Sequence, residues 1–525
     1  MELKNTTKSG QAGWVRYCCK EGDCNEGVRF KNTDPLNEEP YDIAIIGAGV
    51  VGCALAYELS QYQSRVILIE KAFDVGEGTS KANSAIIHTG FDAAAGSLES
   101  ELVSSASREW PDMAQKLKVP MVQTGAIVLA FSEDQQKQLA AIQQKSVDNG
   151  VTDNEILDAT TVRKLEPNVN PNVRGGLRVP RESIIDPFAV SIAFAEVALS
   201  NGTDILFGAE VNSITETDQS VKTVHVNKDL KIRCNIIINV AGLWSRAVAD
   251  QYKGEAFHIN PRRGQFLLYD KTCRKLIEHI LLPIPTKKTK GKLIAPTIFG
   301  NILTGPTAED LPYGSNDAND TTQEGLEEIE ASTHQMCPSL ADQPVIAAYA
   351  GLRCNCQEGS YFIRFNDMHP GIVTVTGIRS TGLTSSFMLA RYIIDGMKEQ
   401  SGLNLIRNTK AKNSRDESSW PGWWKPPYEN EDKLASCPDY GKMICYCENI
   451  SSGELRDALC SPLSPQTTDA LKRRTRAHMG RCQGFNCGVP IIETVRDHSE
   501  IPMASVTKRG PGSNWISPQV QKEAR

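Results

Sequence analysis

A glycine-rich stretch early in the chain restricts the fold more than any other feature. Gly47, Gly49 and Gly52 follow the apolar run at residues 42–46 and open a helical pattern that ends near Ser60. In such a strand, turn and helix, the first glycine permits the tight turn and the second lets the backbone approach a diphosphate. The third lets the helix pack closely on the strand. The helix N-terminus then offers free N–H groups to phosphates. The pattern predicts a dinucleotide-binding α/β unit.

An acidic residue completes this pattern. A second apolar run at residues 65–69 ends at Glu70. An acid at this place is expected to hydrogen-bond a hydroxyl of the adenosine ribose. The alternative, a glycine-rich turn in an unrelated α/β protein, does not require strand, helix and acid together. The motif by itself does not distinguish FAD from NAD.

Three further segments carry a family resemblance: residues 78–90, 239–245 and 377–384. At these segments the sequence resembles the FAD-dependent D-amino-acid-oxidase-like superfamily. Within it, the sequence is most similar to the branch of anaerobic glycerol-3-phosphate dehydrogenase large subunits and L-2-hydroxyglutarate dehydrogenases. The resemblance covers roughly residues 41–400. It implies an α/β fold in which a Rossmann-type FAD-binding domain is interleaved with an antiparallel-sheet substrate domain.

The resemblance also implies a set of FAD-binding residues. A helix that opens at residues 382–384 would direct its N-terminus at the pyrimidine edge of the flavin and stabilise the reduced, anionic form. Small polar side chains would lie beside the flavin, and glycine or alanine would let the backbone pass close to it. The predicted residues are Gly47, Gly49, Gly52, Glu70, Ser80, Asn83, Ser84, Ala241, Gly242, Gly377, Gly382, Leu383 and Thr384.

Arg353 is the predicted substrate-binding residue. It ends Ala350-Gly351-Leu352-Arg353, which is similar to a family segment whose arginine binds the anionic group of the substrate. A guanidinium suits phosphate or carboxylate because it donates two parallel hydrogen bonds. The alternative is an arginine in a surface ion pair. The family commonly has proline after this arginine, so Cys354 is expected to loosen a loop here. Further positive charge is available from Arg262, Arg263, Lys287 and Lys288, although solvated surface charge is the simpler interpretation of each.

His88 is the predicted catalytic base. It matches the histidine of a family segment that lies close to the flavin. A histidine can take a hydroxyl proton while hydride leaves the adjacent carbon. The alternative is a neutral imidazole that only packs against the cofactor.

Four cysteines near the C-terminus form two close pairs, Cys445 with Cys447 and Cys482 with Cys487. Four thiolates in two pairs indicate a metal site. Zinc also accepts four sulfurs, but this spacing differs from the usual zinc-ribbon pairs. Ser451 and Glu454 form a capping box, which predicts a helix just after the first pair. A second helix is predicted at residues 468–476.

This segment resembles the bacterioferritin-associated-ferredoxin-like (BFD-like) [2Fe–2S] domain found at the end of many such dehydrogenases. The similarity includes residues 472–477 and 479–484, and it covers about 60 residues. His478 stands where the family usually has glycine, which is expected to reshape the turn and leave the ligands intact. The resemblance implies a [2Fe–2S] cluster; zinc and a degenerate, metal-free domain are the alternatives.

Composition and hydrophobic patterning limit where the protein is expected in the cell and which partners it is expected to bind. The chain has 15 cysteines and a net charge of −6, which gives no reason to expect nucleic-acid binding. No apolar run is long enough to span a bilayer. The first 40 residues lack the apolar core of a secretory signal and carry several acids. We therefore expect a cytoplasmic protein without a transmembrane segment, in which clustered cysteines serve metal or redox chemistry.

The predicted organisation has five parts. Residues 1–40 are expected to be a mobile tail, whose Cys18, Cys19 and Cys24 lack a nearby fourth metal ligand. An FAD-dependent oxidoreductase domain follows at 41–400, with FAD binding at about 41–96, 185–256 and 351–400 and a substrate domain at about 97–184 and 257–350. A linker at 401–438 contains Trp420, Trp423 and Trp424. A small helical [2Fe–2S] domain at 439–500 and a polar tail at 501–525 complete the chain.

Together these features predict a dehydrogenase that oxidises a small anionic secondary alcohol. The resemblance favours sn-glycerol 3-phosphate, with L-2-hydroxyglutarate as the alternative. Electrons would pass from FAD through the [2Fe–2S] cluster to an external acceptor, and the resemblance allows for additional subunits. An alternative of another class is a flavin and iron–sulfur electron-transfer or redox-sensing subunit without its own substrate, although such a carrier would not need Arg353.

Overall fold

A computed structural model describes most of the 525-residue chain. It covers three short strands within the first 38 residues, and then residues 39–216, 221–252, 254, 256–285, 291–367, 369–401, 403–415 and 426–516. Several residues that the sequence singles out lie outside this part of the chain: Cys18, Cys19, Cys24, Lys287, Lys288, Trp420, Trp423 and Trp424.

The larger sheet has a parallel centre. Its central strands run in the order β12 (Asp204–Phe207), β5 (Val66–Ile69), β4 (Tyr41–Ile46), β15 (Leu230–Asn239) and β23 (Ile372–Thr376). The second half of β15 is apolar and pairs in parallel with β4 and β23. Antiparallel strands extend the sheet: β22 (Phe362–Phe365), β14 (Lys222–Val226) and β13 (Val211–Glu216).

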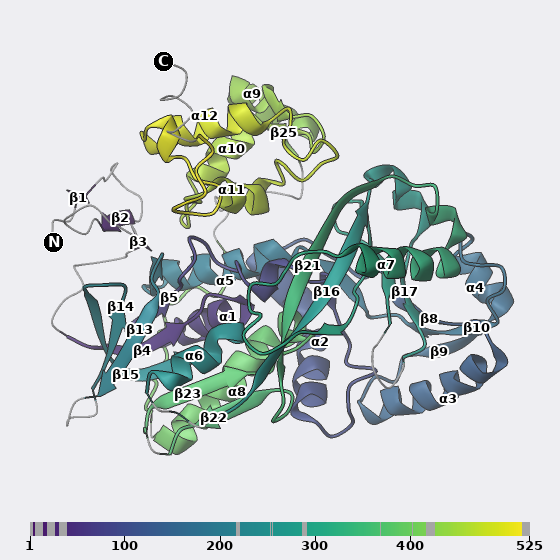
Figure 1. The fold of residues 1–525 in the computed structure, drawn as a ribbon, viewed down its shortest axis with the longest axis horizontal. Helices are drawn as coiled ribbons and strands as arrows, with labels where there is room; N and C mark the ends of the chain where they lie inside the picture. The colour runs from purple at the N-terminus through teal and green to yellow at the C-terminus, as the bar shows by residue number, and fades with distance from the viewer. Residues whose placement is uncertain are drawn as a thin grey trace.

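Helices cover one face of this sheet and bury its largest core. They are α1 (Val50–Leu59), α2 (Leu98–Leu117), α5 (Pro187–Ser200) and α8 (Gly382–Ser401). Helix α5 begins where sequence rules place it, because Asp186 caps its N-terminus and proline occupies the first turn. The short helix α6 (Ser245–Asp250) packs with the other face. Figure 1 shows α1, α5 and α8 in one layer beside the strands.

A second, nine-stranded sheet is mostly antiparallel, as predicted. Its strands are β8 (Ala126–Ala130), β9 (Glu155–Asp158), β10 (Gly175–Val179), β16 (Ile259–Tyr269), β17 (Ile280–Pro283), β18 (Leu293–Pro296), β19 (Ile302–Gly305), β20 (Glu309–Asp310) and β21 (Val345–Cys356). The helices beside it are α3 (Glu133–Asp148), α4 (Ala159–Leu165) and α7 (Gln323–Met336). The long strands β16 and β21 pair with each other and reach from this sheet toward the larger sheet (Figure 1).

A small antiparallel sheet lies between the part of the chain that contains the larger sheet and the part that contains the nine-stranded sheet. It consists of β6 (Ile86–Ile87), β11 (Ser183–Ile185) and β7 (Met121–Val122). In its register Ser183 pairs with Ile87. Since neighbouring residues of antiparallel strands stay opposite each other, this pairing brings residues 88 and 182 together just beyond the strands.

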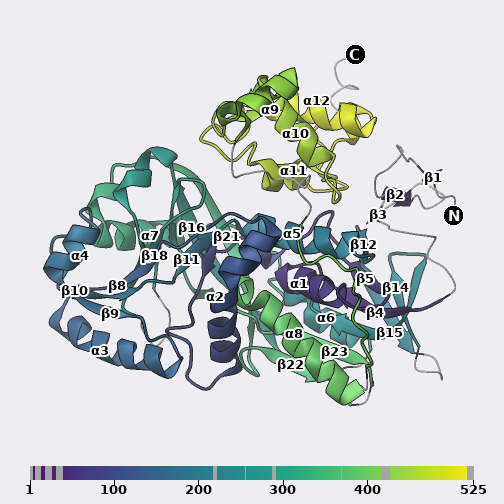
Figure 2. The ribbon, with the colours of Figure 1, turned by 180° about the vertical axis from the view of Figure 1, so that it is seen from behind.

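The C-terminal region is a separate group of short helices lying above α5 (Figures 1 and 2). It contains α9 (Glu431–Ser436), β24 (Met443–Cys445), β25 (Ile450–Ser451), α10 (Ser452–Leu459), α11 (Thr468–Thr475) and α12 (Gly488–Ser499). The predicted helix after the first cysteine pair is α10, which begins with the capping box of Ser451 and Glu454. The second predicted helix, at residues 468–476, corresponds to α11.

Three segments predicted to be tail or linker have structure of their own. Strands β1 (Lys4–Asn5), β2 (Trp14–Tyr17) and β3 (Gly27–Phe30) extend the large sheet, since β3 pairs with β12. Residues 403–415 lie along the helical face, where the buried Arg415 forms an ion pair with Glu196 at 2.6 Å. Residues 501–516 pack on the C-terminal helices, and Val506 is buried. The described residues of the expected tails and linker thus pair with the large sheet or pack on other elements, and the predicted domain bounds stay predictions.

Candidate functional site

A cavity of about 620 Å³ lies where four parallel strands end. Residues directly after β4, β5, β15 and β23 form its wall, as expected for ligand binding at the carboxyl ends of such strands. Of the predicted FAD-binding residues, ten line it: Gly47, Gly49, Glu70, Ser80, Asn83, Ala241, Gly242, Gly377, Gly382 and Leu383. Gly52, Ser84 and Thr384 are outside the lining.

Two glycines are required by the backbone itself. Gly47 has φ of +107°, and a Cβ there would lie 2.8 Å from the Val240 carbonyl oxygen. A Cβ on Gly52 would lie 1.9 Å from the Gly47 carbonyl oxygen. Gly52 therefore acts as expected of the third glycine, by letting α1 pack against the turn. The turn leaves the start of α1 open toward the cavity, which suits an anionic diphosphate.

Glu70 is held by two backbone N–H groups. Ala48 and Ala72 donate to its two carboxylate oxygens at 2.7 and 2.9 Å. Burial raises the pKa of Glu70, and these two hydrogen bonds oppose the rise. Its predicted contact with an adenosine ribose stays a prediction, and the carboxylate is in place for it because it lines the cavity.

Some lining residues escaped the sequence interpretation. The Lys71 ammonium lies 3.4 Å from the ring centroid of Trp244, and both residues line the cavity. Trp244 belongs to one of the family motifs, so a signal existed for it. Arg509 also lines the cavity, although it lies in the segment expected to be a tail. No local pattern points to Arg509.

His88 follows β6 and is held by two contacts. Its backbone N–H donates to Thr384 Oγ1 at 3.0 Å, which ties it to the start of α8 beside the cavity. Its Nδ1 lies 3.0 Å from Glu182 Oε2. The buried Glu182 also accepts hydrogen bonds from the N–H and hydroxyl of Thr89, at 2.7 and 2.9 Å. An ionised carboxylate only accepts, so Nδ1 carries the proton and Nε2 is left as a base.

Glu182 was missed by the sequence interpretation because no motif contains it. It lies 94 positions from His88, and only the strand register brings the two together. The role of His88 stays a prediction.

Arg353 lies on β21, opposite Arg262 of β16. Its Nη1 donates to the Thr307 carbonyl at 3.3 Å. Burial, with the charge of Arg262 as a second cause, lowers the pKa of Arg353 to about 10. Within the described part of the chain, no carboxylate forms an ion pair with Arg353, whereas Arg262 pairs with Asp310 at 2.6 Å. Arg353 is therefore a partly desolvated cation that suits an anionic ligand.

Two expectations around Arg353 are corrected. Its segment is an extended strand, and Cys354 continues the pairing of β21 with β16, so there is no loop to loosen. Arg263 forms an ion pair with Glu309 at 2.7 Å, as Arg262 does with Asp310. These two arginines are thus engaged at the edge strand β20. No hydrogen bond or ion pair joins Arg353 to His88 in the described residues.

The four C-terminal cysteines lie together as two hydrogen-bonded pairs, Cys445 with Cys487 and Cys447 with Cys482. The first pair is buried and the second is half-buried. Two pairs match a [2Fe–2S] cluster, in which each iron takes two thiolates. Among the described residues, no three His, Cys, Asp or Glu side chains surround one point closely enough for a single ion.

Backbone N–H groups point at these sulfurs. The hydrogen bond from Cys487, joined by the N–H groups of Glu448 and His478, lowers the pKa of Cys445 to about 6. His478 has φ of +74°, which explains why glycine suits this position, and its N–H also reaches Cys487. The predicted reshaping of the turn thus leaves the four thiols in place. N–H groups aimed at thiolates stabilise their negative charge and would stabilise a cluster bound to them.

Comparison with known proteins agrees with both halves of the structure. Residues 42–395 match the family described as FAD dependent oxidoreductase, and residues 443–495 match the BFD-like [2Fe-2S] binding domain. The chain is 35% identical to glycerol 3-phosphate dehydrogenase of Caloramator mitchellensis, over 92% of this chain and 100% of that one. It is 25% identical to one of the subunits of the anaerobic glycerol-3-phosphate dehydrogenase of Escherichia coli, over 85% and 86% of the two chains.

A solved structure shows the same fold. L-alpha-glycerophosphate oxidase from Mycoplasma pneumoniae with FAD bound superimposes with a TM-score of 0.67 and 28% identity, over 72% of this chain and 99% of that chain. The predictions of FAD and of a [2Fe–2S] cluster are confirmed by these matches. No helix in the described ranges has the length and apolar character needed to cross a membrane.

Proposed function

The chain belongs to the family of FAD dependent oxidoreductases and carries a BFD-like [2Fe-2S] binding domain, and from this premise we propose that it oxidises sn-glycerol 3-phosphate to dihydroxyacetone phosphate. The names of its relatives support this substrate. FAD, held by the residues that line the cavity, would supply an acceptor for the hydride of the carbinol carbon. A [2Fe–2S] cluster held by Cys445, Cys447, Cys482 and Cys487 would supply a one-electron outlet to an acceptor outside this chain.

Arg353 carries the proposal. Its guanidinium has no carboxylate partner among the described residues. Arg353 itself is outside the cavity lining, whereas the next residue of β21, Cys354, belongs to it. An anionic substrate would neutralise this cation and be fixed by two parallel hydrogen bonds. A phosphate monoester supplies that anion at one end of the molecule and leaves the secondary hydroxyl free for reaction. The carboxylate of L-2-hydroxyglutarate is the alternative, because the same fork accepts it.

His88 would take the hydroxyl proton on Nε2 while the C–H bond breaks. The carboxylate of Glu182 fixes the tautomer and stabilises the imidazolium that forms. Thr384 holds the His88 backbone against α8, whose first residues line the cavity. Each of these roles uses a group whose hydrogen-bond partners are already in place.

The half-buried cysteine pair suggests where electrons leave. Tyr446 lies between Cys445 and Cys447, and Phe485 lies between Cys482 and Cys487; the two side chains are 70% and 90% exposed. Exposed aromatic side chains are typical of protein contact sites. We therefore place the approach of an acceptor protein at this turn. The Escherichia coli relative is named as one subunit of its enzyme, which supports an acceptor on another chain.

Anaerobic mixing tests the substrate directly. The purified holoprotein is mixed with glycerol 3-phosphate or with L-2-hydroxyglutarate, and the flavin absorbance is followed. We expect glycerol 3-phosphate to bleach the flavin and then to produce the EPR signal of a reduced cluster. Bleaching by L-2-hydroxyglutarate alone would replace the substrate, and bleaching by neither would favour an electron carrier without its own substrate.

Substitution of Arg353 tests the binding role. Arg353→Ala should raise KM about 10- to 100-fold, as expected for losing charge-assisted hydrogen bonds, and leave FAD bound. Arg263→Ala is the matched control, since Arg263 lies on the adjacent strand but is already paired with Glu309. Equal effects of the two substitutions would contradict the assignment.

A further inference from the structure

Arg509 stands apart from the other described residues that line the cofactor cavity, because it lies beyond both family matches. Those matches end at residues 395 and 495, whereas Arg509 follows the iron–sulfur segment. It nevertheless lines the cavity together with Gly47, Gly49 and Ser80, which surround the start of α1. A residue some 460 positions along the chain from this glycine turn thus shares a cavity wall with it.

A short turn formed by residues 507–514, here named the C-terminal turn, holds Arg509 in place. Thr507 and Asn514 bridge its ends. The backbone N–H of Arg509 donates to Ser513 Oγ at 2.8 Å. Gly510 presses against Phe73, since a Cβ on Gly510 would lie 2.4 Å from the Phe73 ring. The C-terminal turn is therefore packed on the segment that follows Glu70.

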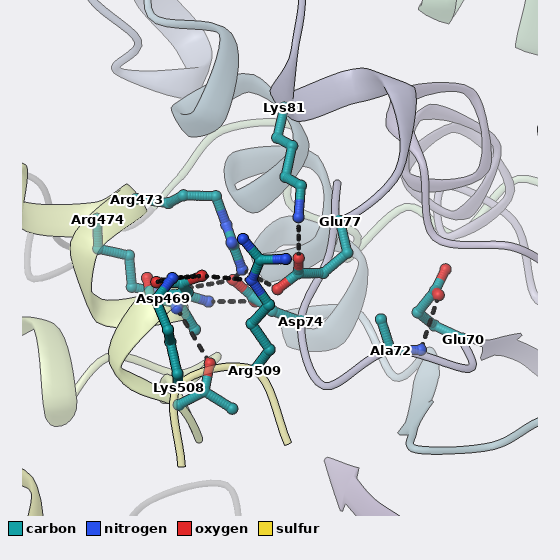
Figure 3. Close-up of polar contacts among 12 residues, drawn as sticks. Glu70, Ala72, Asp74, Glu77, Lys81, Asp469, Arg473, Arg474, Lys508 and Arg509 are labelled. Atoms are coloured by element: carbon teal, nitrogen blue, oxygen red, sulfur yellow. Dashed lines mark hydrogen bonds and ion pairs between the residues drawn. The ribbon is translucent and has the colours of Figure 1, made fainter. Parts of the chain in front are cut away.

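The charge around Arg509 is only partly balanced. Asp469 of α11 accepts from Lys508 Nζ at 2.9 Å and from Arg509 Nε at 3.0 Å, so one carboxylate serves two cations. Burial opposes ionisation, but these cations outweigh it and lower the pKa of Asp469. Glu77, which also lines the cavity, is already paired with Arg473 and Lys81. Figure 3 shows Arg509 reaching into this group from the C-terminal side.

We propose that Arg509 is an FAD-binding residue whose guanidinium supplies positive charge to the diphosphate of FAD. The side chain lines the cavity and is 61% exposed, and its Nε binds Asp469, so its terminal N–H groups are accessible to a ligand. A diphosphate at the start of α1 is the anion that a family member must hold there, and a guanidinium is the side chain that best binds phosphate oxygens. The proposal depends on FAD binding and not on which alcohol is oxidised.

One consequence follows for the arrangement of the two redox centres. Because Arg509 is carried by the iron–sulfur region, FAD is bound fully only when that region is docked on the oxidoreductase part. FAD binding and docking then stabilise each other, because binding that favours one arrangement is reciprocal. The arrangement that binds FAD most tightly is therefore also the one in which the cluster is docked to accept electrons from the flavin.

FAD affinity of the full-length protein tests the proposal. The flavin is removed and titrated back, with flavin fluorescence as the readout, for the parent, Arg509→Ala, Arg509→Lys and Arg496→Ala. Arg496 is the matched control: it lies on α12 of the same region, pairs with the neighbouring Asp497 and is outside the cavity. We expect Arg509→Ala to raise the Kd for FAD about tenfold and Arg509→Lys to raise it less, because lysine keeps the charge. Arg496→Ala should change it less than about twofold.

Cluster absorbance and EPR in each variant show that the iron–sulfur region is still folded. The loss in Arg509→Ala should shrink as salt is added, since screening weakens the interaction of the parent with the diphosphate. An Arg509→Ala protein with an intact cluster and parental FAD affinity would overturn the proposal. If Arg509→Ala loses its cluster, Arg509→Gln replaces it, because glutamine removes the charge and keeps a polar side chain of similar length. Parental FAD affinity of an Arg509→Gln protein with an intact cluster would then overturn the proposal.

Discussion

Arg474 and Asp74 form a two-pronged ion pair across 400 positions of sequence, with N–O distances of 2.8 and 2.9 Å. Both side chains are buried. Arg473 adds a contact of 2.7 Å to Asp74 and also binds Glu77 (Figure 3). These contacts fix the iron–sulfur region on the segment that follows Glu70, so they set the relative position of the two cofactor sites.

Breaking this ion pair should loosen the contact between the two cofactor regions. Asp74→Asn removes the carboxylate that pairs with the buried Arg474 and one of the two carboxylates that pair with Arg473. Removing one partner of a buried pair costs about 3–5 kcal/mol. We expect a lower melting temperature and weaker FAD binding, although Asp74 does not line the cavity. Asp153→Asn is the control, because Asp153 pairs with Arg181 in the same two-pronged way at the surface. There the cost should be at most about 1 kcal/mol. Similar melting shifts for both variants would contradict the docking role.

Glu182 should affect catalysis through His88. In Glu182→Gln the amide can donate to Nδ1, which moves the imidazole proton to Nε2 and removes the base. We expect kcat to fall about 100-fold with a changed pH profile, while FAD stays bound. Glu166→Gln is a matched control, since the buried Glu166 binds His279 Nδ1 at 2.8 Å away from the cofactor cavity. It should lower stability but leave the pH profile of kcat unchanged. A normal pH profile in Glu182→Gln would remove Glu182 from the mechanism.

Substitution of a ligand cysteine should remove the cluster and leave FAD bound. Cys445→Ser removes a buried thiol from the first pair, so we expect loss of the [2Fe–2S] absorbance and EPR signals. Flavin bleaching by substrate should persist, because hydride transfer does not need the cluster. Cys460→Ser, at the exposed end of α10, is expected to keep both signals. Retention of a normal cluster in Cys445→Ser would contradict the ligand assignment.

Asp186 should make stability depend on pH. Burial raises the pKa of this N-cap residue of α5 to about 6, and the N–H groups of Ala189 and Phe188 oppose the rise. Since the folded-state pKa lies above the unfolded value of about 3.9, the folded form holds the proton more tightly. Stability therefore falls as pH rises from about 4 through 6, by about 3 kcal/mol in total.

Asp186→Asn removes this cost and keeps an acceptor for the cap. We expect it to be more stable than the parent at pH 8, with the advantage shrinking toward pH 5, as measured by melting temperatures across this range. The control is Asp158→Asn at the exposed N-cap of α4, where hydrogen bonds from Thr161 lower the pKa. That variant should show no gain at pH 8. An advantage of Asp186→Asn that is constant with pH would contradict the assigned pKa.

Sequence patterns predicted the features that are formed by residues close together in the chain. Gly52 packs against the Gly47 carbonyl within one turn, Glu70 accepts from the nearby Ala72, and each sequence pair of cysteines lies within one short segment. The same holds for the capping box at Ser451, because a helix start is stabilised by side chains of its own first turn. Spacing along the chain is sufficient information for such features.

The interpretation failed where a contact joins distant segments. Glu182, Asp74 and Arg509 belong to no motif, and each acts through a residue brought near by strand register or by docking of the C-terminal region. One residue of the segment expected to be a C-terminal tail, Arg509, lines the cofactor cavity for this reason. Its polar composition resembles that of a loose segment, whereas its position depends on Gly510 against Phe73 and on Asp469.

The sequence by itself therefore determined the class of the protein, its two cofactors and the residues of the local motifs. Only the tertiary structure decided which carboxylate contacts His88, that Arg353 has no carboxylate partner among the described residues, and that Arg509 of the C-terminal region lines the cavity. The physical reason is that glycine turns, caps and thiolate pairs are short-range, whereas ion pairs and cavity walls depend on how separately formed elements pack. A charged residue shows no sign in sequence of whether its partner is solvent, a ligand or a side chain hundreds of positions away.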